Sequence, residues 1–280
     1  MMTTDPERLK TGLENLLDDR DYLYRLVSTI DWDAQLEAIR AVLREHRRSA
    51  DHVSTNIKEL EEEARTYQGP YHDHVVDEHV DAMWRSTYSD AAISLSAVGM
   101  IVPTLETIFA QAFRALGDKY VAKGIAPPDH KRWRRAKDNP ERWNVQWYFG
   151  KSDAGVDIVS GLPQLCDATG VSAHLRPDDL DWIVALLSYR NRMFHGGFEW
   201  SIPQRQTFVA LIAERGWDQY FVWSTTDHEP WICFLRDQVI DALPDRVFAI
   251  LGSLGRFTKA LPYELMSDPG DEPPPDIPQD

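Results

Sequence analysis

Hydrophobic residues recur every three or four positions along most of this chain, the spacing that places them on one face of an α-helix. The first such run holds Leu9, Leu13, Leu16 and Leu17, and Asp5 stands before it as a possible cap. The pattern predicts helices over residues 6–27, 31–67 with a break near 49, 71–87, 90–123, 155–169, 177–195, 203–215 and 236–260.

One segment alternates apolar and polar residues instead. Residues 218–235, "DQYFVWSTTDHEPWICFL", do so around a central Thr-Asp-His turn, which predicts a short β-hairpin. The fold class expected from both patterns is mostly α, a helical bundle with one short β-hairpin between the last two long helices.

Composition divides the chain into three parts. Residues 1–89 form an N-terminal helical region, and residues 90–262 form a helical bundle with a basic, loop-rich insertion at about 124–150. Residues 263–280 are acidic and rich in proline, so we expect a disordered tail there. Pro103 should kink the most apolar helix of the bundle.

The stretch "LLSYRNRMFHGGFEW" places polar and charged groups at the end of an apolar helix. Arg190 lies on the same helical stripe as Trp182, Ile183, Leu186, Leu187, Met193 and Phe194. Its guanidinium should therefore meet a packed surface, where it needs a partner. Asn191 and His195 are four residues apart and share an adjacent face. Gly196 and Gly197 then end the helix, where a left-handed cap is expected.

Arg190, Asn191 and His195 suit phosphate chemistry. An arginine presents a planar fork to a phosphate, a histidine can move a proton to or from a hydroxyl, and an asparagine can orient either group. No cluster of carboxylates accompanies them, so no metal and no cofactor is expected.

The segment "RNRMFH" resembles the R-x(4–6)-H motif of the HEPN superfamily, in the form with Asn directly after Arg. The resemblance covers about residues 90–260 and implies an α-helical bundle with the motif near a helix end. It also implies a homodimeric, metal-independent endoribonuclease of a toxin–antitoxin or phage-defence system, with an antitoxin or regulatory protein as a possible partner. Such enzymes leave a 2′,3′-cyclic phosphate and a 5′-OH. Arg190 would stabilise the phosphorane, Asn191 would position, and His195 would be the acid and base.

A second interpretation remains open, because the bare spacing also occurs at Arg47 to His52 and at Arg65 to His72. In that interpretation Arg190 pairs with a buried carboxylate such as Glu106, and His195 only caps its helix. The protein would then be a non-catalytic helical module that binds a partner protein or a nucleotide. Glu106, isolated in an apolar helix, is the predicted salt-bridge partner of Arg190, which it would hold in place.

The insertion "HKRWRRAKDNPERW" has six basic residues against two acidic ones, with tryptophans between them. Basic and aromatic side chains together can follow a phosphate backbone and stack on bases. We therefore predict RNA contacts at Arg132, Arg134, Arg135 and Lys137. The alternative is a basic loop that docks on an acidic neighbouring helix, with its tryptophans in the core.

Other kinds of site are disfavoured by the sequence. His72, His74 and His79 match no zinc pattern and predict a solvated helix face. The sequence has no phosphate-binding P-loop, no dinucleotide-binding glycine motif and no hydrolase nucleophile elbow. Cys166 and Cys233 fit neither a disulfide framework nor a metal site.

The net charge of −15 disfavours a general attraction to nucleic acid or to anionic membranes, but a local basic site stays possible. No apolar run of the roughly 18 residues that span a bilayer is expected, and the N-terminus does not resemble a signal peptide. We therefore predict a cytoplasmic protein that has no membrane partner.

Overall fold

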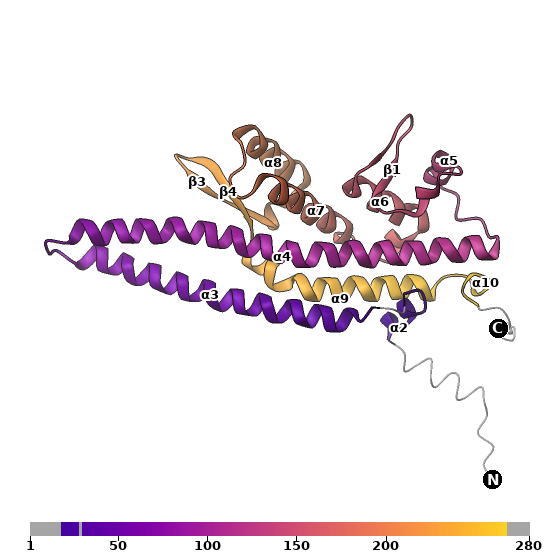
Figure 1. Cartoon of the computed structure of the whole chain (residues 1–280), viewed down its shortest axis with the longest axis horizontal. Coiled ribbons are helices and arrows are strands. Elements are labelled where there is room, and N and C mark those ends of the chain that lie inside the picture. The colour runs from indigo at the N-terminus through magenta and orange to yellow at the C-terminus, as the bar shows by residue number, and fades with distance from the viewer. Residues whose placement is uncertain (1–17, 28–29, 268–280) are drawn as a thin grey trace, which may run out of the picture. The chain divides into compact units, whose positions relative to one another are not determined.

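The computed structural model describes residues 18–27 and 30–267. These residues fold mostly into helices and into two small antiparallel sheets of two strands each (Figure 1). The predicted fold class is confirmed, including the hairpin between the last two long helices, α8 (Ile202–Arg215) and α9 (Asp237–Lys259). The second sheet, which pairs β1 (Trp147–Phe149) with β2 (Ala154–Val156), was not predicted.

The two longest helices are continuous where breaks were predicted. Helix α3 (Trp32–Thr66) passes through residue 49, and α4 (His72–Lys123) passes through residues 87–90. Pro103 lies inside α4, and the kink predicted there stays a prediction. Just before residue 49, Arg47 of α3 pairs with Asp237 at 2.8 Å, a tertiary contact that a local pattern does not include. The domain boundary placed at residue 89 therefore lies inside a helix.

The chain divides into two compact units that interleave along the sequence. The first comprises residues 1–30, 105–182 and 248–280, and the second comprises residues 31–104 and 183–247. Helices α4, α7 (Asp179–Gly196) and α9 each contribute residues to both units.

The first unit holds the basic insertion. Its further elements are α2 (Asp19–Tyr24), α5 (Lys131–Ala136), η1 (Pro140–Trp143), α6 (Ile158–Thr169), η2 (Val171–Ala173) and α10 (Tyr263–Met266). Phe109 and Phe113 of α4 stack in its core at a ring distance of 6.0 Å. A side chain at Gly255 of α9 would begin 1.8 Å from the carbonyl oxygen of Asp19, so only glycine lets α2 approach this closely.

The second unit joins α3 and the first part of α4 to α8, η3 (Trp217–Gln219), β3 (Phe221–Thr226) and β4 (Glu229–Leu235). Its core is aromatic. Tyr189 of α7 lies 5.2 Å from the ring of Phe221, and Phe208 of α8 lies 5.4 Å from the same ring. The hydroxyl of Tyr189 donates to the carbonyl of Cys233 on β4, which ties α7 to the hairpin.

The β3–β4 hairpin turns at Asp227 and His228, as the sequence predicted. Both residues have positive φ, 49° and 65°, the geometry of the tight turns whose twist matches that of paired strands. The register shifts between Trp223 and Thr225, and there the Ser224 hydroxyl accepts from the Ile232 N–H at 3.1 Å. A side chain thus replaces a missing ladder bond.

Three further sequence predictions are wrong or fall partly on residues that the structure does not describe. The tail predicted from residue 263 begins with helix α10, and residues 268–280 lie outside the described residues. Most of the first predicted helix does so too, which leaves α2 as its described part. Helix α4 contains one apolar stretch long enough to cross a membrane, contrary to expectation, and half of that stretch is buried within the structure.

Candidate functional site

Helix α7 carries the motif residues at its C-terminal end. The helix is buried from Trp182 to Tyr189, and exposure rises over its last two turns. Arg190 and Asn191 are half-buried, whereas His195 is exposed. The helical backbone continues through residue 196, so Asn191 and His195 lie one above the other on one face. The convergence of these two side chains with Arg190 stays a prediction.

Glycine closes the helix, as predicted. Gly197 has a φ of +67°, and its N–H donates to the Met193 carbonyl at 2.9 Å. A side chain at Gly197 would meet no atom within 4 Å, so the surface at this turn is open. Trp200 then fixes the chain beyond it, because its indole N–H donates to the Gly197 carbonyl at 2.9 Å.

Burial changes the electrostatics of Arg190. Loss of hydration lowers the pKa of its guanidinium from the usual value, because the charged form is less well solvated there. A cation that has lost part of its water interacts more strongly with an anion than an exposed one does. The position therefore favours a phosphate oxygen or a carboxylate as its counterpart.

Two residues of the motif segment differ from the prediction. Phe194 was placed on the buried stripe, but it is 60% exposed. It lies at the edge of the α4 surface, where a side chain at Gly99 would come within 3.6 Å of its ring. Arg192, for which no role was predicted, is half-buried and places its guanidinium 4.7 Å from the ring centre of Phe208. Arg192 follows buried Tyr189 by three residues on the same helix face, and this spacing could have predicted its partial burial.

Glu199 and Tyr88 also lie beside the motif and were not predicted. The Tyr88 hydroxyl donates to the Glu199 carboxylate, and this hydrogen bond raises the pKa of Tyr88. The Tyr88 ring lies 6.5 Å from that of Phe198, which follows the glycine turn. More than a hundred residues separate Tyr88 from Glu199, so no local pattern could have joined them.

Glu106, the predicted partner of Arg190, is half-buried on α4 in the first unit, whereas Arg190 belongs to the second. Their pairing stays a prediction.

The predicted RNA contact at Arg132 is wrong. This side chain is 0% exposed and is fully engaged with the protein. Its nitrogens donate to the carbonyls of Arg142, Trp147 and Asn144 at 2.8–3.0 Å and to the Gln164 side chain at 2.8 Å. Burial lowers its pKa to about 10. Arg132 thus holds the insertion together, because it joins η1, β1 and α6.

The other three predicted RNA contacts differ in accessibility. Arg134 is exposed and pairs with Asp129, and Lys137 is exposed at the end of α5. Arg135 is half-buried and donates to the Phe149 carbonyl at 3.4 Å. Arg134 and Lys137 are therefore available to a ligand, and Arg135 is available in part.

The remaining sequence signals lead to no further site. Over residues 18–27 and 30–267, no three His, Cys, Asp or Glu side chains are grouped as metal ligands would be. His72 contacts the Tyr67 carbonyl through Nδ1 at 2.7 Å. Cys166 and Cys233 are buried and unbonded, and burial raises the pKa of both thiols.

Comparison with family models, curated proteins and solved structures finds no match to this chain. The assignment of function therefore rests on the site itself.

Proposed function

We propose that this protein is a metal-independent endoribonuclease of the HEPN type that acts through Arg190, Asn191 and His195. One observation carries the proposal: an exposed imidazole and a partly desolvated guanidinium lie near one helix end, beside Gly197, which has open space around it. A phosphodiester could approach at Gly197.

The proposed reaction needs no group beyond these side chains. His195 takes the proton of an RNA 2′-OH while the 2′-oxygen bonds to the adjacent phosphorus. Arg190 donates to the phosphorane oxygens, where negative charge accumulates, and Asn191 positions the phosphate or the ring. The bond from phosphorus to the 5′-oxygen breaks, and an imidazolium protonates that oxygen. The products are a 2′,3′-cyclic phosphate and a 5′-OH.

We further propose that the active form is a homodimer in which Arg190 and His195 of two protomers serve the same phosphate. A toxin or defence role in the cytoplasm, controlled by an antitoxin or a regulatory protein, belongs to the same proposal. Phe194, next to His195, is 60% exposed, so an interface at the motif would remove its apolar surface from water.

RNA cleavage in EDTA tests this function directly. Wild-type protein, His195→Ala and Arg190→Gln are incubated with a mixed-sequence RNA, and the product ends are identified. We expect 2′,3′-cyclic phosphates from wild type and a loss of about a hundredfold or more from either variant. The matched control is His52→Ala, because exposed His52 follows Arg47 at the same spacing on α3.

Two results would contradict the proposal. If His195→Ala cut RNA as fast as wild type, another site or a contaminant would be responsible. If folded, dimeric wild type left every RNA intact, even with cell extract added, the protein would lack ribonuclease activity.

The alternative, a module that binds a partner protein, is favoured by one separate observation. Tyr71, Val80, Met83 and Trp84 expose large apolar surfaces at the start of α4, and Trp84 is 48% exposed. Cross-linking in cells through a photoreactive residue at position 84 distinguishes the two functions. A single protein partner, together with no RNA cleavage, would favour the binding module.

A further inference from the structure

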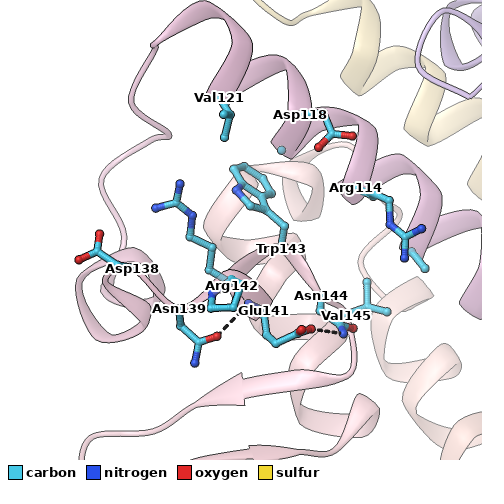
Figure 2. Close-up of a pocket in the computed structure, with 13 residues that line it drawn as sticks. Arg114, Asp118, Val121, Asp138, Asn139, Glu141, Arg142, Trp143, Asn144 and Val145 are labelled. Atoms are coloured by element: carbon cyan, nitrogen blue, oxygen red, sulfur yellow. Dashed lines mark hydrogen bonds between the residues drawn. The ribbon is translucent and has the colours of Figure 1, made fainter.

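The first unit contains a cavity of about 500 Å³ between the second part of α4 and the loop around η1 (Figure 2). Its volume falls in the range of about 300–1,000 Å³ found for small-molecule sites. The α7 motif residues do not line it. Figure 2 shows the Trp143 side chain extending from the loop toward Asp118 and Val121 on α4, with Arg142 on one side of it and Arg114 on the other.

Two guanidiniums line the cavity from different elements. Arg114 is exposed on α4, and Arg142 of η1 donates one hydrogen bond to the Lys137 carbonyl at 3.3 Å. Within the described ranges, no carboxylate forms an ion pair with either of them. Two such forks, with most of their donors unused, suit a phosphate group.

Carboxylates of the same cavity would repel a bare anion. Asp118 lies one helical turn beyond Arg114, and no side chain in the described part of the chain donates a hydrogen bond to it. Glu141 accepts from the Asn144 amide at 2.6 Å through one oxygen, which orients the carboxylate and leaves its other oxygen as an acceptor. A ligand that satisfies both carboxylates must bring hydroxyl or amine donors as well as its own negative charge.

Trp143 supplies a rigid apolar wall. Its ring centre lies 5.5 Å from that of Tyr120 and 4.6 Å from that of Trp133. It also lies so close to α4 that a side chain at Gly117 would begin 2.7 Å from it. Its buried indole N–H meets no acceptor among residues 18–27 and 30–267, which is uncommon in a folded protein.

We propose that this cavity binds one ribonucleotide unit. The side chains of Arg114 and Arg142, which lie on either side of Trp143 in Figure 2, close on the phosphate, the ribose hydroxyls donate to Asp118 and Glu141, and the base rests against the apolar edge formed by Trp143 and Val121. Carboxylates that accept from the 2′-OH distinguish ribose from deoxyribose, which lacks that donor. The proposal concerns binding alone and does not depend on cleavage at α7.

Calorimetric titration of the full chain tests it with AMP, 2′-deoxy-AMP, adenosine and inorganic phosphate. We expect saturable binding of AMP and binding of 2′-deoxy-AMP that is about tenfold weaker, the cost of one lost hydrogen bond to a charged group. Adenosine and phosphate, each with half of the contacts, bind more weakly still. Equal affinity for AMP, its deoxy form and phosphate, or no saturable AMP binding, would overturn the proposal.

Variants locate the site. Arg142→Gln and Arg114→Gln should each weaken AMP binding about tenfold, since each loses a charged contact to the phosphate. Asp118→Asn should reduce the preference for AMP over its deoxy form, and this exposed position carries little risk of misfolding. The control is Arg134→Gln, an exposed arginine of the same insertion that does not line the cavity. An effect of the control equal to that of Arg142→Gln would contradict the location.

The ribonucleotide could be free or part of an RNA strand. Competition between AMP and a six-nucleotide RNA, measured with His195→Ala protein so that the RNA stays intact, separates the two sources. Displacement of AMP by the RNA indicates a strand, and simultaneous binding indicates a free nucleotide. Because these titrations involve no cleavage, their failure would not be confused with a failure of the proposed ribonuclease activity.

Discussion

Arginines that are near neighbours in the sequence have opposite roles in this protein. Arg132 and Arg134 lie two residues apart in one basic segment, yet the first is fully buried among carbonyls and the second extends to solvent. Arg190 and Arg192 are both half-buried, but the second lies over the ring of Phe208. Spacing on a short helix decides which face each guanidinium occupies, and the neighbouring elements decide what it meets.

Arg132→Leu should destabilise the protein strongly. The change removes four hydrogen bonds in a dry environment, although the Asn144 carbonyl and the Gln164 oxygen each keep a backbone donor, so we expect a loss of about 2–4 kcal/mol in the free energy of unfolding. Urea denaturation measures it. Arg134→Leu serves as the control, with an expected change of about 0.5 kcal/mol or less. Equal stability of both variants would contradict the structural role of Arg132.

Asp90 should make stability depend on pH. Burial raises its pKa to about 6, and Asp237 adds to this effect while Arg47 opposes it. Because the folded pKa exceeds the ordinary value, the folded state holds the proton more tightly. This contribution to stability is complete below about pH 4 and is lost as the pH rises through about 6.

Asp90→Asn should therefore stabilise the protein by about 1 kcal/mol at neutral pH, since Asp90 is only partly buried and solvent screens part of the effect. Its advantage should vanish near pH 4. Urea denaturation at both pH values measures the difference, with exposed Asp77→Asn on the same helix as the control. A stabilisation that is the same at both pH values would not come from ionisation of Asp90.

At the scale of elements, the end of α7 depends on backbone that glycine adopts easily. Gly197 is in the left-handed region with open space around it, so strain and not collision opposes a side chain there. Helix α4 shows the opposite case, because it continues through residues 87–90, where the local sequence predicted a break. The Thr87 hydroxyl donates a hydrogen bond to the Met83 carbonyl at 3.3 Å, and the Tyr88 ring packs against Trp231 with a distance of 5.4 Å between ring centres.

Gly197→Ala should lower the free energy of unfolding by about 1–2 kcal/mol, the cost of placing a side chain in the left-handed region. Thermal or urea denaturation measures the loss. The matched control is Gly252→Ala within α9, where the nearest atom to an added side chain is 3.7 Å away, so a neutral or slightly stabilising effect is expected. A neutral result at Gly197 would mean that the turn readily adopts another conformation.

At the scale of the whole molecule, the proposed activity requires two protomers. If one phosphate is served by Arg190 of one chain and His195 of the other, each single variant is inactive as a homodimer. A heterodimer of Arg190→Gln with His195→Ala then contains one intact pair and one doubly defective pair. Subunit exchange between the two variants can therefore restore activity.

We expect about a quarter of wild-type cleavage after equal amounts of the two variants are mixed, because half of the dimers are mixed and each has one of two sites. Cleavage assays before and after exchange measure it, and light scattering confirms the dimer. Recovery should fail with two preparations of the same variant. No recovery by the mixed pair would place Arg190 and His195 of one protomer together at the phosphate.

The sequence alone determined the features that depend on local patterns. Periodicity predicted the helical class, alternation predicted the hairpin, and the glycine pair predicted the end of α7, because each depends on neighbours within a few residues. The position of His195, one turn after Asn191 at an exposed helix end, follows from the same local geometry.

Only the tertiary structure decided which charges are buried and which elements are continuous. It buried Arg132, placed Tyr88 beside Glu199, left Phe194 exposed and interleaved the two units along the chain. These outcomes depend on desolvation and on contacts between residues tens to hundreds of positions apart. The free energy of such contacts does not depend on sequence spacing, so a periodic pattern could not reveal them.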